Sequence, residues 1–134
     1  MTVKNRGGFT LVELMTVLLV LGLLITIAIP NLLGSKIAAN ETAAQATLKT
    51  ISTALETYAS MTNSQFPSST DDLLNISPPY ISENYFDGAV HQGYQYATFT
   101  LTTSAYDIRA TPLSEAQGGN SFSITTGGVL VTNP

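Results

Sequence analysis

The chain has 134 residues, which is room for one small domain together with one membrane segment. Its five basic and nine acidic side chains give a net charge of −4, and this acidic balance argues against binding to nucleic acid, which needs clustered Lys and Arg. The chain has no cysteine, so both disulfide and thiolate chemistry are excluded.

The first element is an apolar segment from Phe9 to Ile29, which carries one charged residue, Glu13. As a helix that rises ~1.5 Å per residue it reaches about 30 Å, the thickness of a bilayer's hydrocarbon core. Apolar residues occur on all its sides, so lipid or other apolar helices must surround it. Lys4 and Arg6 precede it, and the positive-inside tendency therefore predicts a cytoplasmic N-terminus.

Two simple interpretations fit this segment. The first is a secretory signal peptide cleaved near Ala28, although the apolar run is long, Glu13 interrupts its start, and no small-x-small cleavage site follows. The second is a plain single-span anchor in which Thr10 and Glu13 form a capping box, with the Glu13 carboxylate accepting a hydrogen bond from the Thr10 amide.

A third interpretation rests on the stretch GGFTLVELMTVLLVLGLLITIAIPNLL, which resembles the N-terminus of type IV pilins and type II secretion pseudopilins. That family shows a short basic leader ending in Gly, then Phe-Thr-Leu-x-Glu, a long apolar helix, and a Pro further on. The matching residues are Gly8, Phe9, Thr10, Leu11, Glu13 and Pro30. Because this motif is highly specific, we favour the third interpretation over the other two.

The resemblance implies that a prepilin peptidase cuts between Gly8 and Phe9 and methylates the new amine of Phe9. It implies an α+β pilin-like fold, in which a long N-terminal helix, transmembrane in its first half, packs on a four-stranded antiparallel sheet. The subunit would be stored in the bacterial inner membrane as a single-pass protein. It would then polymerise, with the pilus or secretion assembly machinery, into a helical homo-oligomeric filament in an extracellular pilus or a periplasmic pseudopilus.

The same resemblance gives a reason for the acidic residue. A carboxylate deep in a bilayer costs roughly 2.5–3.5 kcal/mol unless it is paired. Cleavage would create a cation at Phe9, one helical turn before Glu13, and in a filament the amine of one subunit can lie against Glu13 of its neighbour. We therefore predict Glu13, Phe9 and Pro30 as assembly residues, and pairing of this kind favours one axial register over others.

Pro30 lacks an amide donor, and we expect it to kink or loosen the helix. Alternatively it ends the anchor, and a new helix begins around Asn31 or Ser35; the resemblance favours one long helix. The stretch 31–62 should be an amphipathic continuation with one apolar stripe that covers a sheet. The stripe residues are Ile37, Ala44, Leu48, Ile51, Leu55 and Tyr58.

Residues 63–92 read as a loop, in which Thr70 is predicted to cap a short helical turn that ends at Leu74. Alternating residues then predict an antiparallel meander, with one strand over 93–102. Within that strand the phase of the alternation changes before Phe99, which indicates a bulge. The other strands are expected around Tyr106–Ala110, Phe122–Ile124 and Val129–Val131, with Gly127-Gly128 as a two-residue hairpin.

The sequence contains no motif of a catalytic or metal site, so we predict neither an enzyme nor a cofactor. His91 is interpreted as a solvated side chain in a loop. Major secretion pseudopilins typically carry an acidic calcium loop near the C-terminus, but Asp87, Asp107 and Glu115 are too sparse here to predict an oxygen cage.

The predicted organisation is a leader (1–8), a transmembrane and filament-core helix (9–30), its amphipathic continuation (31–62), and a head of loop and sheet (63–134). The predicted function is a structural pilin subunit that polymerises through apolar helix packing and pairing of Glu13 with the N-terminal amine. A type II secretion pseudopilin is the alternative within the family. The alternatives from other classes are a secreted binding domain with an ordinary signal peptide and a membrane-anchored enzyme, for which no site is visible.

Overall fold

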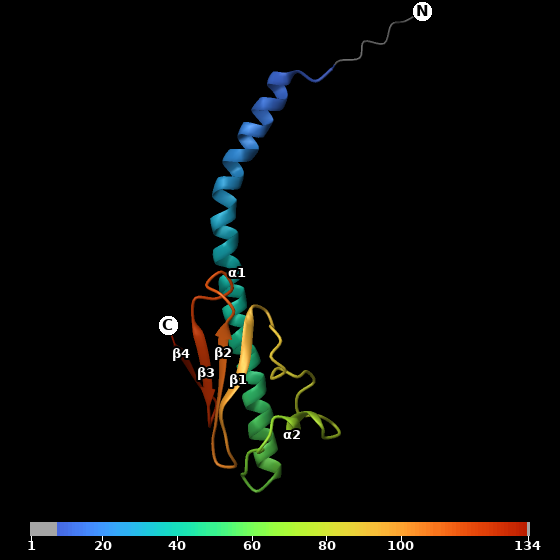
Figure 1. Ribbon diagram of the computed structural model, residues 1–134, viewed down its shortest axis with the longest axis vertical. Coiled ribbons are helices and arrows are strands. Elements are labelled where there is room, and N and C mark those ends of the chain that lie inside the picture. Colours follow the sequence, from blue (N-terminus) through green and yellow to red (C-terminus); the bar gives the residue numbers. More distant parts are fainter. Residues whose placement is uncertain (1–7, 134) are drawn as a thin grey trace, which may run out of the picture. The chain divides into compact units, whose positions relative to one another are not determined.

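The computed structural model of the chain describes residues 8–133, so most of the predicted leader, with Lys4 and Arg6, lies outside the described residues. The chain divides into two compact units, one up to Ser35 and one from Lys36 onward. The elements, in order, are α1 (Leu11–Met61), α2 (Asp71–Leu74), β1 (Tyr94–Leu101), β2 (Tyr106–Pro112), β3 (Ser121–Thr125) and β4 (Val129–Asn133) (Figure 1). This is the predicted α+β fold with a long N-terminal helix.

Helix α1 continues through Pro30 without interruption. The favoured prediction of one long helix is therefore confirmed, and the alternative of a new helix around Asn31 or Ser35 is excluded. Side-chain hydrogen bonds to carbonyls one turn earlier accompany the proline: Asn31 Nδ2 donates to the Ile27 carbonyl at 3.1 Å, and Ser35 Oγ donates to the Asn31 carbonyl at 2.9 Å. Pro30 has no amide N–H, so the helical ladder lacks one backbone hydrogen bond at this turn although the helix continues.

In the second unit, one face of α1 is buried against the sheet, as the apolar stripe predicts. Ala44, Leu48, Ile51 and Leu55 are all at most 1% exposed. The stripe weakens at its ends, since Ile37 and Tyr58 are only half-buried. The helix ends at Met61, and Asn63 and Ser64, both with positive φ, turn the chain back toward the sheet.

The four strands form one antiparallel meander in the order β1-β2-β3-β4, as predicted. The register between β1 and β2 shifts between Thr98 and Thr100, which confirms the bulge. Phe99 lies at this bulge and is 67% exposed. Phe99 does not join Tyr94 and Tyr96 in the core, because it lies five residues after Tyr94 and so on the outer face, where the Arg109 guanidinium is 3.7 Å from its ring centroid.

Three local predictions need correction. Thr125 pairs with Val129, so the β3–β4 hairpin has a three-residue loop and not a two-residue one, and Gly127 and Gly128 both take positive φ in it. Thr70 makes no side-chain cap to α2. Ser69 caps it instead, because Ser69 Oγ accepts from the Asp71 amide at 3.2 Å while the Asp72 carboxylate accepts from the Ser69 amide at 3.3 Å.

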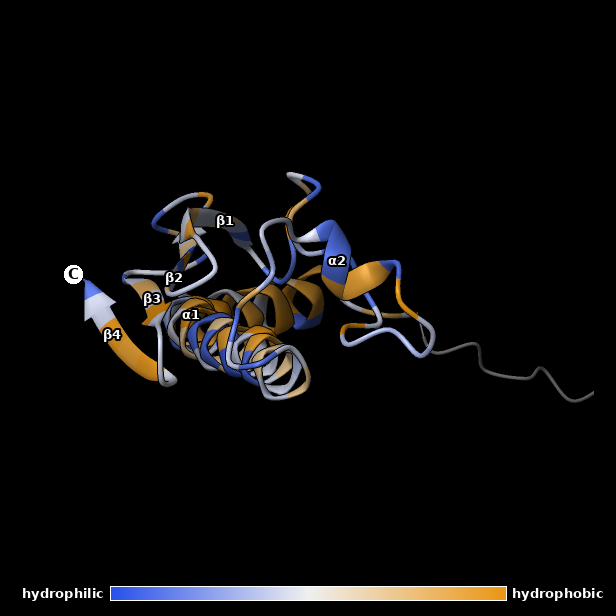
Figure 2. Ribbon diagram, turned by 90° about the horizontal axis from the view of Figure 1, so that it is seen from below, coloured by the Kyte–Doolittle hydropathy of each residue, from blue (hydrophilic) through white to orange (hydrophobic). Residues whose placement is uncertain are grey.

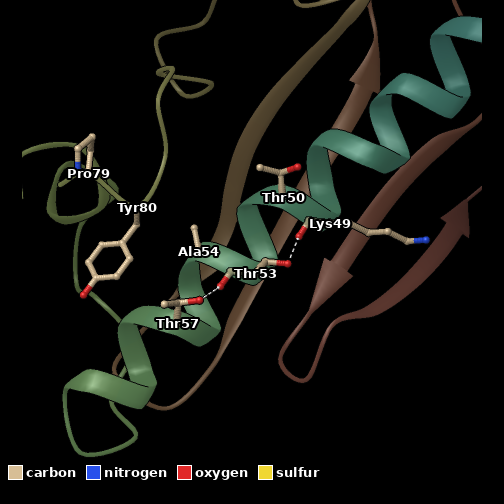
Figure 3. Close-up of a pocket in the computed structure, with 7 residues that line it drawn as sticks. All are labelled: Lys49, Thr50, Thr53, Ala54, Thr57, Pro79 and Tyr80. Carbon is tan, nitrogen blue, oxygen red and sulfur yellow. Dashed lines mark hydrogen bonds between the residues drawn. The ribbon is translucent and has the colours of Figure 1, made fainter.

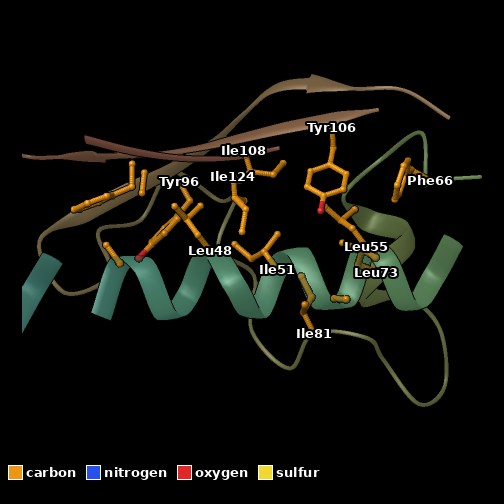
Figure 4. Close-up of a cluster of buried hydrophobic side chains, with 14 of the residues drawn as sticks. Leu48, Ile51, Leu55, Phe66, Leu73, Ile81, Tyr96, Tyr106, Ile108 and Ile124 are labelled. Carbon is orange, nitrogen blue, oxygen red and sulfur yellow. The ribbon is translucent and has the colours of Figure 1, made fainter. Parts of the chain in front are cut away.

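The core lies between α1 and the inner face of the sheet (Figure 4). Leu48, Ile51 and Leu55 on α1 face Ile108 on β2 and Ile124 on β3, and all five side chains are at most 1% exposed. Burying each such side chain contributes about 1.5–3 kcal/mol relative to leaving it exposed. The long loop closes the core at its end and side with three further buried side chains, Phe66, Leu73 and Ile81.

Candidate functional site

The start of α1 is organised around Glu13. Its Oε2 atom accepts a hydrogen bond from the Thr10 amide at 2.8 Å and one from Thr10 Oγ1 at 2.6 Å. The Glu13 amide in turn donates to Thr10 Oγ1 at 3.2 Å. This is the reciprocal capping box that the sequence allowed, and it satisfies two amides that the first helical turn would otherwise leave unpaired.

The Glu13 carboxylate nevertheless keeps acceptor capacity. Within residues 8–133, both hydrogen bonds to the Glu13 carboxylate are accepted by Oε2. The Oε1 atom accepts none from the described residues. A carboxylate can accept about four hydrogen bonds, so the capping box leaves room for a cationic donor.

The predicted processing positions lie before this box, outside any helix. Gly8 is exposed, and a Cβ atom added to it would meet no described atom within 4 Å. Phe9 is 84% exposed. Packing in the described part of the chain therefore places no demand on either side chain, and a requirement for Gly at position 8 would have to come from another protein.

The first part of α1 exposes an apolar surface on all its sides. Every large apolar side chain from Phe9 to Leu33 is between 45% and 84% exposed. By length and composition α1 is able to cross a membrane. In the second unit, Figure 2 shows the sheet on one side of α1 and α2 on another.

The head carries a shallow groove between α1 and the loop that holds Pro79 and Tyr80 (Figure 3). Its volume is about 460 Å³. Its threonine hydroxyls are already used, since Thr53 Oγ1 donates to the Lys49 carbonyl and Thr57 Oγ1 to the Thr53 carbonyl. The groove thus presents neither a nucleophile with a base nor a set of metal ligands.

The prediction that His91 is solvated is wrong. Its side chain is 16% exposed, with Nδ1 3.4 Å from Glu83 Oε1 and Nε2 3.9 Å from Asp87 Oδ1. The rings of Tyr85 and Tyr96 lie against it, with centroids 5.2 Å and 6.1 Å away. His91 therefore organises the loop before β1 through contacts with side chains four to eight residues away in the chain.

The acidic residues that were considered as calcium ligands lie in other arrangements. Asp107 pairs with Arg109 at 3.3 Å, and Asp87 lies beside His91. Among the described residues no group of three His, Asp or Glu side chains is placed to hold a metal ion. These residues do not fit a calcium cage.

The loop between β2 and β3 is held by side chains from α1. Glu41 Oε1 accepts hydrogen bonds from the Gly119 amide at 3.1 Å, the Asn120 amide at 3.2 Å and Asn120 Nδ2 at 3.1 Å. Asn40 Nδ2 donates to the Gln117 carbonyl at 2.8 Å. Sequence reasoning missed these residues, because partners more than seventy positions apart leave no local signal.

A second α1 glutamate holds the other end of β3. Glu56 Oε1 accepts from the Gly127 amide at 2.9 Å and from the Tyr106 hydroxyl at 2.9 Å. The Tyr106 hydroxyl also lies 2.7 Å from Ser52 Oγ. Glu41 and Glu56 therefore fix the turns before and after β3 through hydrogen bonds to backbone amides.

Comparison with known proteins agrees with this arrangement of elements. Residues 3–29 match the family model described as "Prokaryotic N-terminal methylation motif". The chain is 33% identical over 70 residues to type II secretion system core protein G of Aeromonas hydrophila, covering 52% of this chain and 48% of that protein. It is 32% identical over 88 residues to the protein of the same name from Escherichia coli K12, covering 63% of this chain and 59% of that one.

The chain thus spans about half the length of the curated relatives it matches. The family model covers the N-terminal motif and the apolar segment that follows it. The long helix packed on a four-stranded antiparallel sheet agrees with these matches. The motif and the similarity to type II secretion system core protein G together support the family of type IV pilins and type II secretion pseudopilins.

Proposed function

We propose that the chain is a structural subunit of a filament of the type II secretion kind, a pseudopilin, anchored in the bacterial inner membrane until it is assembled. The names of its relatives favour this role over the pilus subunit that the sequence analysis placed first. The family is one of structural subunits and not of enzymes. A subunit of an extracellular type IV pilus remains the second candidate, supported by the shared N-terminal motif.

The observation that carries the proposal is the apolar surface formed by Phe9 and by α1 up to Leu33, exposed throughout, with one carboxylate near its start. Water cannot be the stable surrounding of such a surface, since each exposed Leu or Ile side chain forgoes roughly 1.5–3 kcal/mol of burial. Lipid meets this requirement in the stored subunit, and the same segment of neighbouring subunits meets it in a filament.

Processing between Gly8 and Phe9 prepares the subunit for assembly. The capping box survives the cut, because Thr10 and Glu13 both lie after it and their hydrogen bonds involve no earlier residue. The cut creates an ammonium at Phe9, and N-methylation preserves its charge. The partner enzyme is a prepilin peptidase of the inner membrane, as the motif implies.

Assembly then pairs the new amine of one subunit with Glu13 of a neighbour. The Oε1 atom, which the capping box leaves without a described donor, is the acceptor for this pair. Surrounded by apolar helices, an unpaired carboxylate is costly, and the pair therefore favours the axial register in which amine and carboxylate meet.

The test compares variants that separate charge from capping. Glu13→Gln keeps an acceptor for the capping box and loses the charge, Glu13→Val loses both, and Thr10→Ala weakens the box and keeps the charge. We expect all three subunits to be inserted and processed, but Glu13→Gln and Glu13→Val to form few filaments and Thr10→Ala to form them normally. Electron microscopy scores the filaments, and an immunoblot scores the mature protein.

Abundant filaments from both Glu13 variants would remove the electrostatic account of assembly. A deletion of the chain then separates the two candidate functions. Loss of secreted proteins from the medium, with surface pili unchanged, is expected for a pseudopilin, whereas loss of surface pili with normal secretion would favour the pilus subunit.

A further inference from the structure

Charge is distributed unevenly over the head. Residues 36–134 carry three basic and eight acidic side chains, a net charge of −5. Two copies of the head therefore repel each other over most of their surface. Residues 116–134, however, contain no charged residue, and this range includes all of β3, the hairpin and β4. Charge depletion is typical of the core of a protein–protein interface.

Strand β4 lies at the edge of the sheet (Figure 2). It pairs only with β3, and its outer edge has no strand partner within residues 8–133. Val129 is 56% exposed and Val131 is 41% exposed. Edge strands usually carry charges, a proline or a bulge that prevent pairing with another chain. The described part of β4 has none of these, and the charged residues of the sheet, Asp107 and Arg109, lie on the inner strand β2.

The opposite edge of the sheet is uncharged as well. The first part of β1 is partly covered, since His91 and Tyr94 form a bridge outside the sheet. Its next residues, Ala97 to Thr100, are all exposed and uncharged. Phe99 lies at the bulge with the Arg109 guanidinium 3.7 Å from its ring centroid, so regular pairing is available at Ala97 and Thr98. Ala97 is on the same face of the sheet as Val131, because direct cross-strand partners join Ala97 to Arg109, Arg109 to Ser123, and Ser123 to Val131.

The number of strands makes these two edges compatible. In an antiparallel meander of four strands, β1 and β4 run in opposite directions. The strands run alongside the second half of α1 (Figure 4). When two copies lie side by side with these helical halves parallel, β4 of one copy meets β1 of the next as an antiparallel neighbour, which is the pairing used throughout the sheet.

We infer that the outer edge of β4 binds the exposed part of β1 in a second copy of this chain, so that the sheets of neighbouring heads join by strand addition. The contact is heterologous, and repeated copies can therefore extend it into a chain of heads. This contact brings the uncharged β4 edge of one acidic head against the β1 edge of the neighbouring head. The inference rests on the proposed filament, in which copies share one orientation.

The native chain has no cysteine, so disulfide trapping is unambiguous. The test uses the full chain, produced with its assembly machinery, as three variants: Val131→Cys, Ala97→Cys and the double variant. Within one chain these two positions are three strands apart, about 14 Å at the usual strand spacing, too far for a disulfide. Every disulfide must therefore join two chains. Val131→Cys combined with Thr53→Cys, an exposed position on α1, is the matched control.

After mild oxidation in membranes we expect the double variant to give a ladder of dimers, trimers and longer species, while each single variant and the control stay monomeric. Dimers from Val131→Cys alone would indicate a pair of two β4 strands and would overturn the inference. Filaments seen by electron microscopy without a ladder would also overturn it, with the proposed function intact. The absence of both filaments and a ladder would contradict the proposed function, and the inference would fail with it.

Discussion

Tyr94 connects β1 to the loop between β2 and β3. It is fully buried, and its hydroxyl donates to the Asn120 carbonyl at 2.7 Å. Gly118 lies so close to the ring that a Cβ atom there would collide with the Tyr94 hydroxyl. Burial, together with the nearby Glu41 carboxylate, raises the pKa of Tyr94 to about 12. The phenolate is thus disfavoured in the folded head.

This shift predicts how stability changes with pH. The pKa of Tyr94 is higher in the folded chain than in the unfolded chain, where a tyrosine ionises near pH 10, so the unfolded chain loses the proton first. The contribution of Tyr94 is therefore complete below about pH 10 and is lost as the pH rises toward about 12.

We expect the free energy of unfolding of a head that begins at Lys36 to fall over this alkaline range. Tyr94→Phe should make the fall shallower. Burial also raises the pKa of Tyr96 and of Tyr106, so the fall should not vanish in that variant. Urea titrations between pH 8 and pH 12 measure the free energy of unfolding at each pH. If this free energy fell equally steeply with pH in the unchanged head and in Tyr94→Phe, Tyr94 would ionise normally in the folded head.

At the scale of elements, α1 is the support on which the sheet is built. Leu55 is 1% exposed on the face that meets the sheet. Leu55→Ala should lower the free energy of unfolding of the same head by about 2–5 kcal/mol, since it leaves a cavity in a packed core. Thr53→Ala, at an exposed position two residues earlier on α1, is the control and should change it by less than about 0.5 kcal/mol. An unchanged denaturation curve for Leu55→Ala would mean that this face of α1 does not meet a core.

The glutamates of α1 have a different role in the same packing. Glu41 supplies one oxygen to three donors of the β2–β3 loop. Glu41→Ala leaves those donors without this acceptor, and we expect it to lower the free energy of unfolding by about 1–3 kcal/mol. Glu41→Gln retains an acceptor and should lose less.

The control for this prediction is Glu115→Ala, in the same loop but exposed, which should have little effect on the same unfolding measurement. If Glu41→Ala and Glu115→Ala were equally stable, the α1 carboxylate would not be what holds the loop. Unchanged stability on adding a calcium chelator would agree with a loop that is held by Glu41.

At the scale of the whole molecule, the leader and the rest of the chain impose separate requirements. Gly8 has open space around it, so a larger side chain there should not disturb the described structure. We expect Gly8→Val to fold and insert normally but to accumulate as the uncut precursor, because a bulky residue would not fit the peptidase site. An immunoblot and N-terminal sequencing measure this, and a normal amount of mature protein that begins at Phe9 would contradict it.

The sequence by itself determined the features that depend on local order. Hydrophobicity alone indicates the apolar half of α1, a 3.6-residue period gives the buried stripe from Ala44 to Leu55, and alternation gives the four strands and the bulge before Phe99. Thr10 and Glu13 are close enough in the chain for their capping box to be visible as well. Each of these signals lies within a few residues of what it predicts.

The tertiary structure decided what depends on residues that are far apart in the chain. Glu41 reaches Asn120, and Glu56 reaches Gly127. The polar partner of a helix residue depends on which loop the sheet's topology places beside it. No period or short motif records that choice, because only the folded sheet brings these backbone amides to the helix.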